Sequence, residues 1–224
     1  MPGGKAVLTL GRPPRYASRM HRFVKVLWIA CALQGAAAAA EPDEPADYRG
    51  MLEAHNSWRR AVGSPDLLWS HEAAQQAQAW ADELARNECQ AKHSSDETRR
   101  KNFGENIYYY WLSRPYQGYR RDPIGVVGSW GKEIEYYDEQ NDECHAPEGR
   151  SCRHYTQVVW SRSTHVGCGR AHCDSAEVWV CEYSPRGNLY PVRPYEPRTP
   201  GAAAAPASGD LLPTQAAPAA PPPP

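Results

Sequence analysis

Hydrophobic side chains recur at helical spacing in three segments of the chain, and each segment predicts a helix. The first apolar face consists of Tyr48, Met51, Leu52, His55, Trp58 and Val62. The second face follows Ser70, a residue type that caps helices, and consists of Ala73, Ala77, Trp80, Ala81 and Leu84. The third follows Pro123 and consists of Ile124, Val127, Trp130, Ile134 and Tyr137.

Short runs rich in β-branched and aromatic residues predict strands at residues 107–110, 156–160, 166–170 and 177–180. The helical segments lie mostly before the strands. This order favours an α+β fold, in which helices cover an antiparallel sheet, over a fold of alternating parallel units.

Residues 1–40 predict an export signal. Basic side chains precede the apolar run 26–33, and the alanines at 36–40 suit a signal peptidase. A start at Met20 would give a more compact signal. The run is far shorter than the ~20 residues that cross a bilayer, so we expect no membrane span and a secreted, extracellular protein. A hydrophobic helix of the mature fold and a lipid anchor on Cys31 are the alternatives.

Composition sets the predicted limits of the domain. The 21 prolines crowd into the two ends of the chain. Residues 41–45 are therefore predicted to be a linker, 46–190 the domain, and 191–224 a disordered tail rich in proline and alanine. The 25 Lys and Arg residues nearly balance 26 Asp and Glu residues, which gives no electrostatic case for a nucleic-acid partner. We expect a monomer.

Six cysteines remain once the export signal, with Cys31, is removed. They are Cys89, Cys144, Cys152, Cys168, Cys173 and Cys181. An even number in an exported chain predicts disulfides, whereas a zinc site would favour closely spaced Cys-x-x-Cys pairs. Spacing alone leaves fifteen pairings open.

A series of polar motifs runs through the predicted domain in a fixed order. It comprises His-Asn at 55–56, Cys-x-x-x-His-Ser at 89–94, Gly-Glu-Asn-Ile at 104–107, Trp-x-x-Glu at 130–133, His-Tyr-Thr-Gln-Val-Val-Trp at 154–160 and Val-Gly-Cys-Gly at 166–169. This series resembles the CAP superfamily of cysteine-rich secretory proteins, antigen-five allergens and plant pathogenesis-related proteins of class one. The resemblance covers residues 46–190 and implies an α-β-α sandwich with a large cleft.

The resemblance also implies which residues line that cleft: His93, Glu105, Glu133 and His154, with Asn106 and Tyr155 beside them. The plant members imply the disulfides Cys89–Cys173, Cys144–Cys152 and Cys168–Cys181. The chain departs from the family pattern at Glu182, where asparagine is more usual, and at Arg153, which replaces a frequent glycine.

Two imidazoles and two carboxylates are a donor set that zinc accepts. We therefore expect zinc on His93 and His154, with Glu105 and Glu133 nearby. The alternative is a hydrogen-bonded His–Glu network that shapes the cleft.

Three functions fit these residues. We expect a non-enzymatic binding protein in defence or host interaction, with a cell-surface ligand. One alternative is sterol or lipid binding, which the aromatic residues of segment 108–119 would serve, whereas Arg99, Arg114, Arg120 and Arg121 would equally suit an anionic partner. The other is a metal-assisted hydrolase, although the chain has neither a His-Glu-x-x-His nor a Gly-x-Ser-x-Gly motif. We expect no enzyme.

Overall fold

A computed structural model describes residues 43–112, 115 and 118–197 of the chain. The predicted export signal and residues 198–224 of the predicted tail lie outside this range. Within it, no helix is both long and apolar enough to cross a membrane.

The elements follow in the order η1 (Ala46–Tyr48), α1 (Met51–Val62), β1 (Leu68–Trp69), α2 (His71–Arg86), α3 (Glu97–Asn102), β2 (Gly104–Trp111), α4 (Pro123–Gly131), η2 (Lys132–Tyr136), β3 (Tyr137–Asp138), β4 (Glu143–Cys144), α5 (Arg153–Val158), β5 (His165–His172) and β6 (Ala176–Ser184).

Four strands form the main sheet in the order β1-β5-β6-β2. The pairs β5–β6 and β6–β2 are antiparallel, whereas the two-residue strand β1 runs parallel to β5. The sheet is therefore antiparallel, as predicted, except for the short parallel pair β1–β5, which makes it mixed. Strands β3 and β4 form a separate antiparallel pair.

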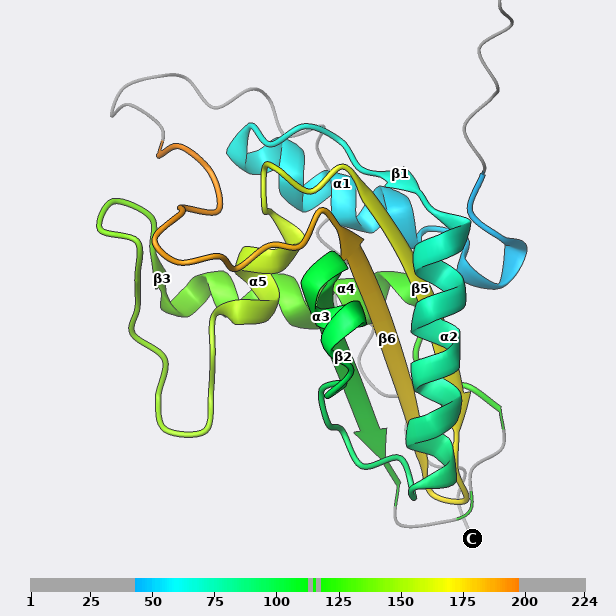
Figure 1. The fold of residues 1–224 in the computed structure, drawn as a ribbon. Helices are drawn as coiled ribbons and strands as arrows, with labels where there is room; N and C mark the ends of the chain where they lie inside the picture. The colour runs from blue at the N-terminus through cyan, green and yellow to red at the C-terminus, as the bar shows by residue number, and fades with distance from the viewer. Residues whose placement is uncertain (1–42, 113–114, 116–117, 198–224) are drawn as a thin grey trace, which may run out of the picture. The chain divides into compact units, whose positions relative to one another are not determined.

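Helices cover both faces of the main sheet, so the fold is an α+β sandwich of three layers (Figure 1). On β6, Val178 and Val180 pack with Ala77 and Ala81 of α2. The alternate residues of the same strand point to the other face. There Trp179, Cys181 and Tyr183 join a core with side chains of α1, α4 and α5.

Close approach of α2 to the sheet depends on two glycines of β5. A Cβ atom added to Gly169 would lie 2.3 Å from the backbone of Gln78, and one on Gly167 would lie 2.1 Å from the nitrogen of Ala74. The small residues Ala73, Ala77 and Ala81 face the strand from the helix and are fully buried. Helix and sheet therefore meet at a distance that larger side chains would prevent.

Two predicted elements differ from the structure. The third helix ends at Gly131 and continues as η2, and both Ile124 (46%) and Ile134 (40%) are exposed, so the predicted apolar face is not buried as a whole. The strand predicted at residues 156–160 is wrong, because residues 153–158 form α5. Most side chains of α5 are buried, which removes the amphipathic period by which a helix is recognised.

Three disulfides join Cys89 to Cys173, Cys144 to Cys152 and Cys168 to Cys181, in the pairing that the resemblance implies. The first ties the segment after α2 to the end of β5. The second joins β4 to the residue that precedes α5. The third crosslinks β5 and β6 within the sheet.

Packing continues past Tyr190, the predicted end of the domain. Tyr195 is buried, belongs to the core, and its hydroxyl lies 3.0 Å from that of Tyr155. At the other end, the Glu44 carboxylate accepts hydrogen bonds from the backbone nitrogens of Gly50 and Leu52, at the start of α1. The packed part thus includes residues on both sides of 46–190.

Candidate functional site

A cleft of about 610 Å³ opens beside α3 and between the ends of β2 and β6. Four of the predicted site residues line it: His93, Glu105, Asn106 and His154. Glu133 lies behind His154 rather than in the lining. Tyr155 is fully buried in the core, where its hydroxyl lies 3.0 Å from that of Tyr195, so its side chain does not face the cleft.

His93 and Glu105 form the first of two imidazole–carboxylate pairs. Nδ1 of His93 lies 2.5 Å from Oε1 of Glu105, which also accepts a hydrogen bond of 3.2 Å from the backbone nitrogen of Ser94. The imidazole is 67% exposed and the carboxylate only 11%. The anchored carboxylate therefore orients an imidazole that stands in solvent.

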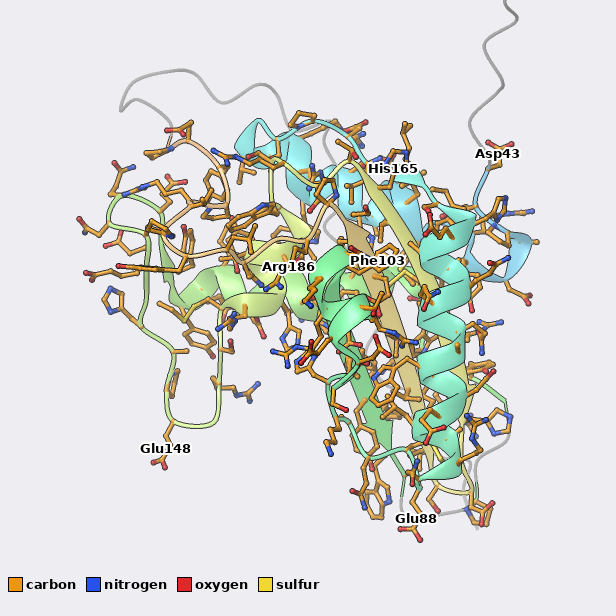
Figure 2. All side chains as sticks on the ribbon, viewed as in Figure 1. Asp43, Glu88, Phe103, Glu148, His165 and Arg186 are labelled. Atoms are coloured by element: carbon orange, nitrogen blue, oxygen red, sulfur yellow. A yellow bond between two sulfur atoms is a disulfide. The ribbon has the colours of Figure 1, made fainter. Side chains whose placement is uncertain are left out.

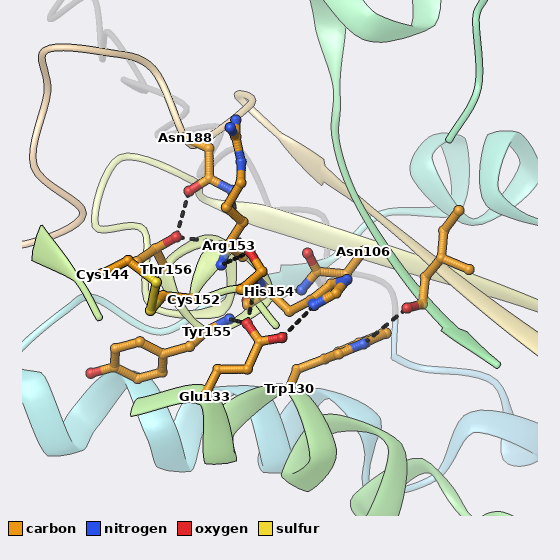
Figure 3. Close-up of polar contacts among 12 residues, drawn as sticks. Asn106, Trp130, Glu133, Cys144, Cys152, Arg153, His154, Tyr155, Thr156 and Asn188 are labelled. Carbon is orange, nitrogen blue, oxygen red and sulfur yellow. Dashed lines mark hydrogen bonds and ion pairs between the residues drawn. A yellow bond between two sulfur atoms is a disulfide. The ribbon is translucent and has the colours of Figure 1, made fainter. Parts of the chain in front are cut away.

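His154 and Glu133 form the second pair (Figure 3). Nδ1 of His154 lies 2.6 Å from Oε1 of Glu133, and the other carboxylate oxygen accepts from the backbone nitrogens of His154 and Tyr155. Glu133 thus satisfies free N–H groups in the first turn of α5 while it orients the imidazole. The ring of Trp130 stacks on His154, with centroids 6.4 Å apart and planes 17° apart.

A network of buried hydrogen bonds connects the second pair to helix α1 and strand β6. The Asn106 side-chain nitrogen donates to the carbonyl of His154 (3.0 Å) and to the Tyr183 hydroxyl (3.2 Å). That hydroxyl lies 2.7 Å from Nε2 of His55, whose Nδ1 lies 2.8 Å from the carbonyl of Met51. Burial lowers the pKa of His55 to about 4, so its imidazole is neutral at physiological pH.

The donor set suits a metal in one respect. In metal sites, a histidine that ligates the metal through one ring nitrogen usually donates the N–H of the other to a carboxylate, a backbone carbonyl or water. Both imidazoles use Nδ1 in this way, and neither Nε2 has a hydrogen bond to any described residue. However, no three His, Cys, Asp or Glu side chains in the described part of the chain are grouped closely enough to hold a metal. The carboxylates therefore orient the imidazoles, and the imidazoles are the available ligands.

Glu182 is a cleft residue to which sequence reasoning gave no role. It is the cross-strand partner of Glu105, it is fully buried, and neither of its carboxyl oxygens has a hydrogen-bond partner among the described residues. Burial and the neighbouring Glu105 raise the pKa of Glu182 to about 9, against the opposing effect of Arg99, whose Nη1 lies 3.9 Å away. The only feature of the sequence that marked Glu182 as unusual was its departure from the asparagine of the family pattern.

The three layers, the three disulfides and the two imidazole–carboxylate pairs define a class of disulfide-bonded α+β domain with a polar cleft. The model of the CAP family, described as the cysteine-rich secretory protein family, matches residues 52–183, which is more than half of the chain. The chain belongs to this family.

Relatives and solved structures agree with this assignment. The chain is 36% identical over 178 residues to pathogenesis-related protein PRMS of Zea mays, covering 77% of this chain and 95% of the relative. It is 37% identical over 147 residues to pathogenesis-related protein PR-1 of Medicago truncatula, covering 65% of this chain and 77% of the relative.

Among solved structures, BmVAL-1 has the same fold, with a TM-score of 0.57 and 24% identity over 72% of this chain and 87% of its own. NaASP2, crystallised with Zn²⁺, has a TM-score of 0.54 and 25% identity over 71% of this chain and 91% of its own.

Proposed function

We propose that this chain is an extracellular CAP protein that acts by binding, and that its cleft takes zinc on Nε2 of His93 and of His154. The observation that carries the proposal is the matching orientation of the two imidazoles, each held at Nδ1 by a carboxylate. The relative NaASP2, crystallised with Zn²⁺, supports it. When bound, zinc supplies a Lewis-acid centre that an oxygen of a ligand can coordinate.

Binding rather than hydrolysis is supported by the surroundings of Ser94, the hydroxyl nearest His93 in sequence. Its hydroxyl oxygen accepts a hydrogen bond of 3.2 Å from the backbone nitrogen of Asp96, and the residue is buried. A serine nucleophile donates its hydroxyl hydrogen to the imidazole, whereas the ring nitrogen of His93 with a partner among the described residues, Nδ1, pairs with Glu105.

An extracellular role in defence or host interaction is supported by the disulfides, which persist in oxidising compartments. It is also supported by the pathogenesis-related relatives of Zea mays and Medicago truncatula. The sterol or lipid alternative rests on a different surface, where Tyr109 and Trp111 of β2 are exposed.

Zinc binding is tested by calorimetric titration of the oxidised, processed protein at pH 7.5 and pH 5.5. We expect one zinc per chain at pH 7.5, weaker binding at pH 5.5 because imidazoles must be deprotonated to ligate, and loss of binding in His93→Ala and in His154→Ala. His71→Ala is the matched control, since His71 is exposed at the start of α2 and outside the cleft. Unchanged binding in both cleft variants would remove the metal site from the proposal.

A further inference from the structure

The lining of the cleft carries a positive charge that the whole chain lacks. The chain as a whole is nearly neutral, with a formal charge of −1. The charged residues of the lining other than histidine are four arginines and two glutamates: Arg99, Arg100, Arg153, Arg186, Glu105 and Glu182. Clustered positive charge in a concave site attracts anionic ligands.

Two of these arginines, Arg99 and Arg186, contact neighbouring groups, yet some of their N–H groups make no hydrogen bond. The guanidinium of Arg99 lies over the Trp80 ring, 5.6 Å from its centroid. That of Arg186 donates to the carbonyl of Arg100 at 2.6 Å. Nε and Nη1 of Arg99 and Nε of Arg186 are nonetheless buried without a hydrogen-bond partner among the described residues. The Glu182 carboxyl group, 3.9 Å from Nη1 of Arg99, is beyond hydrogen-bond distance. Since buried polar groups normally have hydrogen-bond partners, these donors point to an acceptor supplied from outside the chain.

Glu182 adds a second kind of contact on the same wall. Its buried carboxyl group lines the cleft and has no hydrogen-bond partner among the described residues, with Nη1 of Arg99 3.9 Å from Oε1. Because its raised pKa keeps it protonated at neutral pH, it does not cancel the charge of Arg99. A protonated carboxyl group both donates and accepts hydrogen bonds, as a sugar hydroxyl does.

The rest of the lining offers many hydrogen-bonding groups to a polar ligand. Serine, asparagine and glutamine side chains fill most of the remaining positions, and Phe103 is the one large apolar residue in the lining. Figure 2 shows Phe103 and Arg186 beside α3, where both line the cleft. The volume of about 610 Å³ lies within the range of small-molecule sites.

We propose that the cleft binds an acidic oligosaccharide, with Arg99 and Arg186 pairing with its acidic groups and Glu182 hydrogen bonding to one of its hydroxyls. Guanidinium groups pair with carboxylate and sulfate groups in a fixed planar geometry. This inference rests on the proposed binding function, but it does not require zinc, because none of these three side chains is a proposed metal ligand.

The test is calorimetric titration of the full oxidised protein in EDTA. The probes are trigalacturonic acid, which carries carboxylates, a heparin tetrasaccharide, which also carries sulfates, and neutral maltotriose. We expect at least one acidic sugar to bind ten times more tightly than maltotriose. The tighter of the two acidic sugars identifies the acidic group that the arginines prefer.

Variants locate the binding in the cleft. We expect at least a tenfold loss of affinity in Arg186→Gln, which removes a proposed pairing group, and at least a threefold loss in Arg153→Gln, which removes another of the four positive charges of the lining. Because Arg153 is exposed, Arg153→Gln should fold normally, so the test still holds if Arg186→Gln does not fold. Arg86→Gln is the matched control, because Arg86 is exposed and pairs with Glu83 at the end of α2. Melting temperatures verify that each variant is folded.

Three results would overturn the inference: equal affinity for maltotriose and the acidic sugars, unchanged affinity in both cleft variants, or inorganic phosphate binding as tightly as the sugars. The sugar titration is run in EDTA and so without zinc. Its outcome therefore does not depend on whether the separate zinc titration shows binding. Conversely, a protein that binds zinc but no acidic sugar retains the metal site and loses this inference.

Discussion

Glu105 and Glu182 lie directly opposite each other on the neighbouring strands β2 and β6, and both line the same cleft. They differ in their partners. Glu105 accepts hydrogen bonds from His93 and Ser94, whereas the buried carboxyl group of Glu182 has none within the described residues. Like charges directly opposite each other destabilise a sheet, so the unpartnered member is the one that stays protonated.

Glu182→Gln should stabilise the protein at neutral and alkaline pH. The folded-state pKa of Glu182 is about 9, above its ordinary value of 4.5. Between these values the unfolded chain releases a proton that the folded chain retains, so stability falls as pH rises. Glutamine keeps the shape and cannot ionise.

The measurement is the melting temperature of wild type and variant at pH 5, 7 and 8.5. We expect the two proteins to converge at pH 5 and the variant to melt increasingly above wild type towards pH 8.5. Glu53→Gln on the exposed face of α1 should show no such divergence. A constant difference at all three pH values would contradict the raised pKa.

Glu133→Gln should weaken zinc binding by about 10–100-fold, the usual effect of removing a group that orients a metal ligand. Its carboxylate holds Nδ1 of His154 at 2.6 Å and caps the first turn of α5. Calorimetry at pH 7.5 measures the affinity. The control is Glu135→Gln, an exposed neighbour in η2, and equal affinities for the two variants would rule out the orienting role.

Arg59→Gln should destabilise the domain by about 3–5 kcal/mol, since several buried carbonyls would lose their donor. The buried guanidinium of Arg59 donates to four carbonyl oxygens, those of Pro65, Val158, Trp160 and Ser163. These bonds fix the end of α5 and the loop that follows it.

The adjacent residue supplies the control. Arg60 is half-exposed and pairs with Glu53 and Asp66, so Arg60→Gln should cost about 0–1 kcal/mol. Urea denaturation measures the free energy of unfolding of both variants. A similar loss of stability in the two would mean that the buried carbonyls find other donors.

Gly169→Ala should destabilise the domain by about 1–3 kcal/mol or more, because the new methyl group would overlap the backbone of α2 at Gln78. The matched change Gly128→Ala in α4 meets no atom within 4 Å. It should stabilise the helix by about 0.5–1 kcal/mol, since alanine favours helices over glycine. Thermal unfolding measures both changes, and an unaffected Gly169→Ala variant would show that α2 can move away from the sheet.

Local patterns were sufficient where an element has one buried and one exposed face. Helices α1 and α2 have such faces, and their apolar spacing predicted both. The strands β2, β5 and β6 were predicted from their β-branched and aromatic residues. Ordered motifs around His93, Glu105, Glu133 and His154 were specific enough to indicate the family, and the even cysteine count to indicate disulfides.

Only the tertiary structure decided the features that depend on distant neighbours. In the helix of segment 153–158, four consecutive side chains are buried, and burial of that kind leaves no periodic signal in the sequence. Tyr195 joins the core through Tyr155, forty positions away in the chain. Burial in the folded chain, and then the β2–β6 register that places Glu105 opposite, raise the pKa of Glu182. A sequence states which side chains a chain carries, but the charge and partners of a buried group depend on what folding brings beside it.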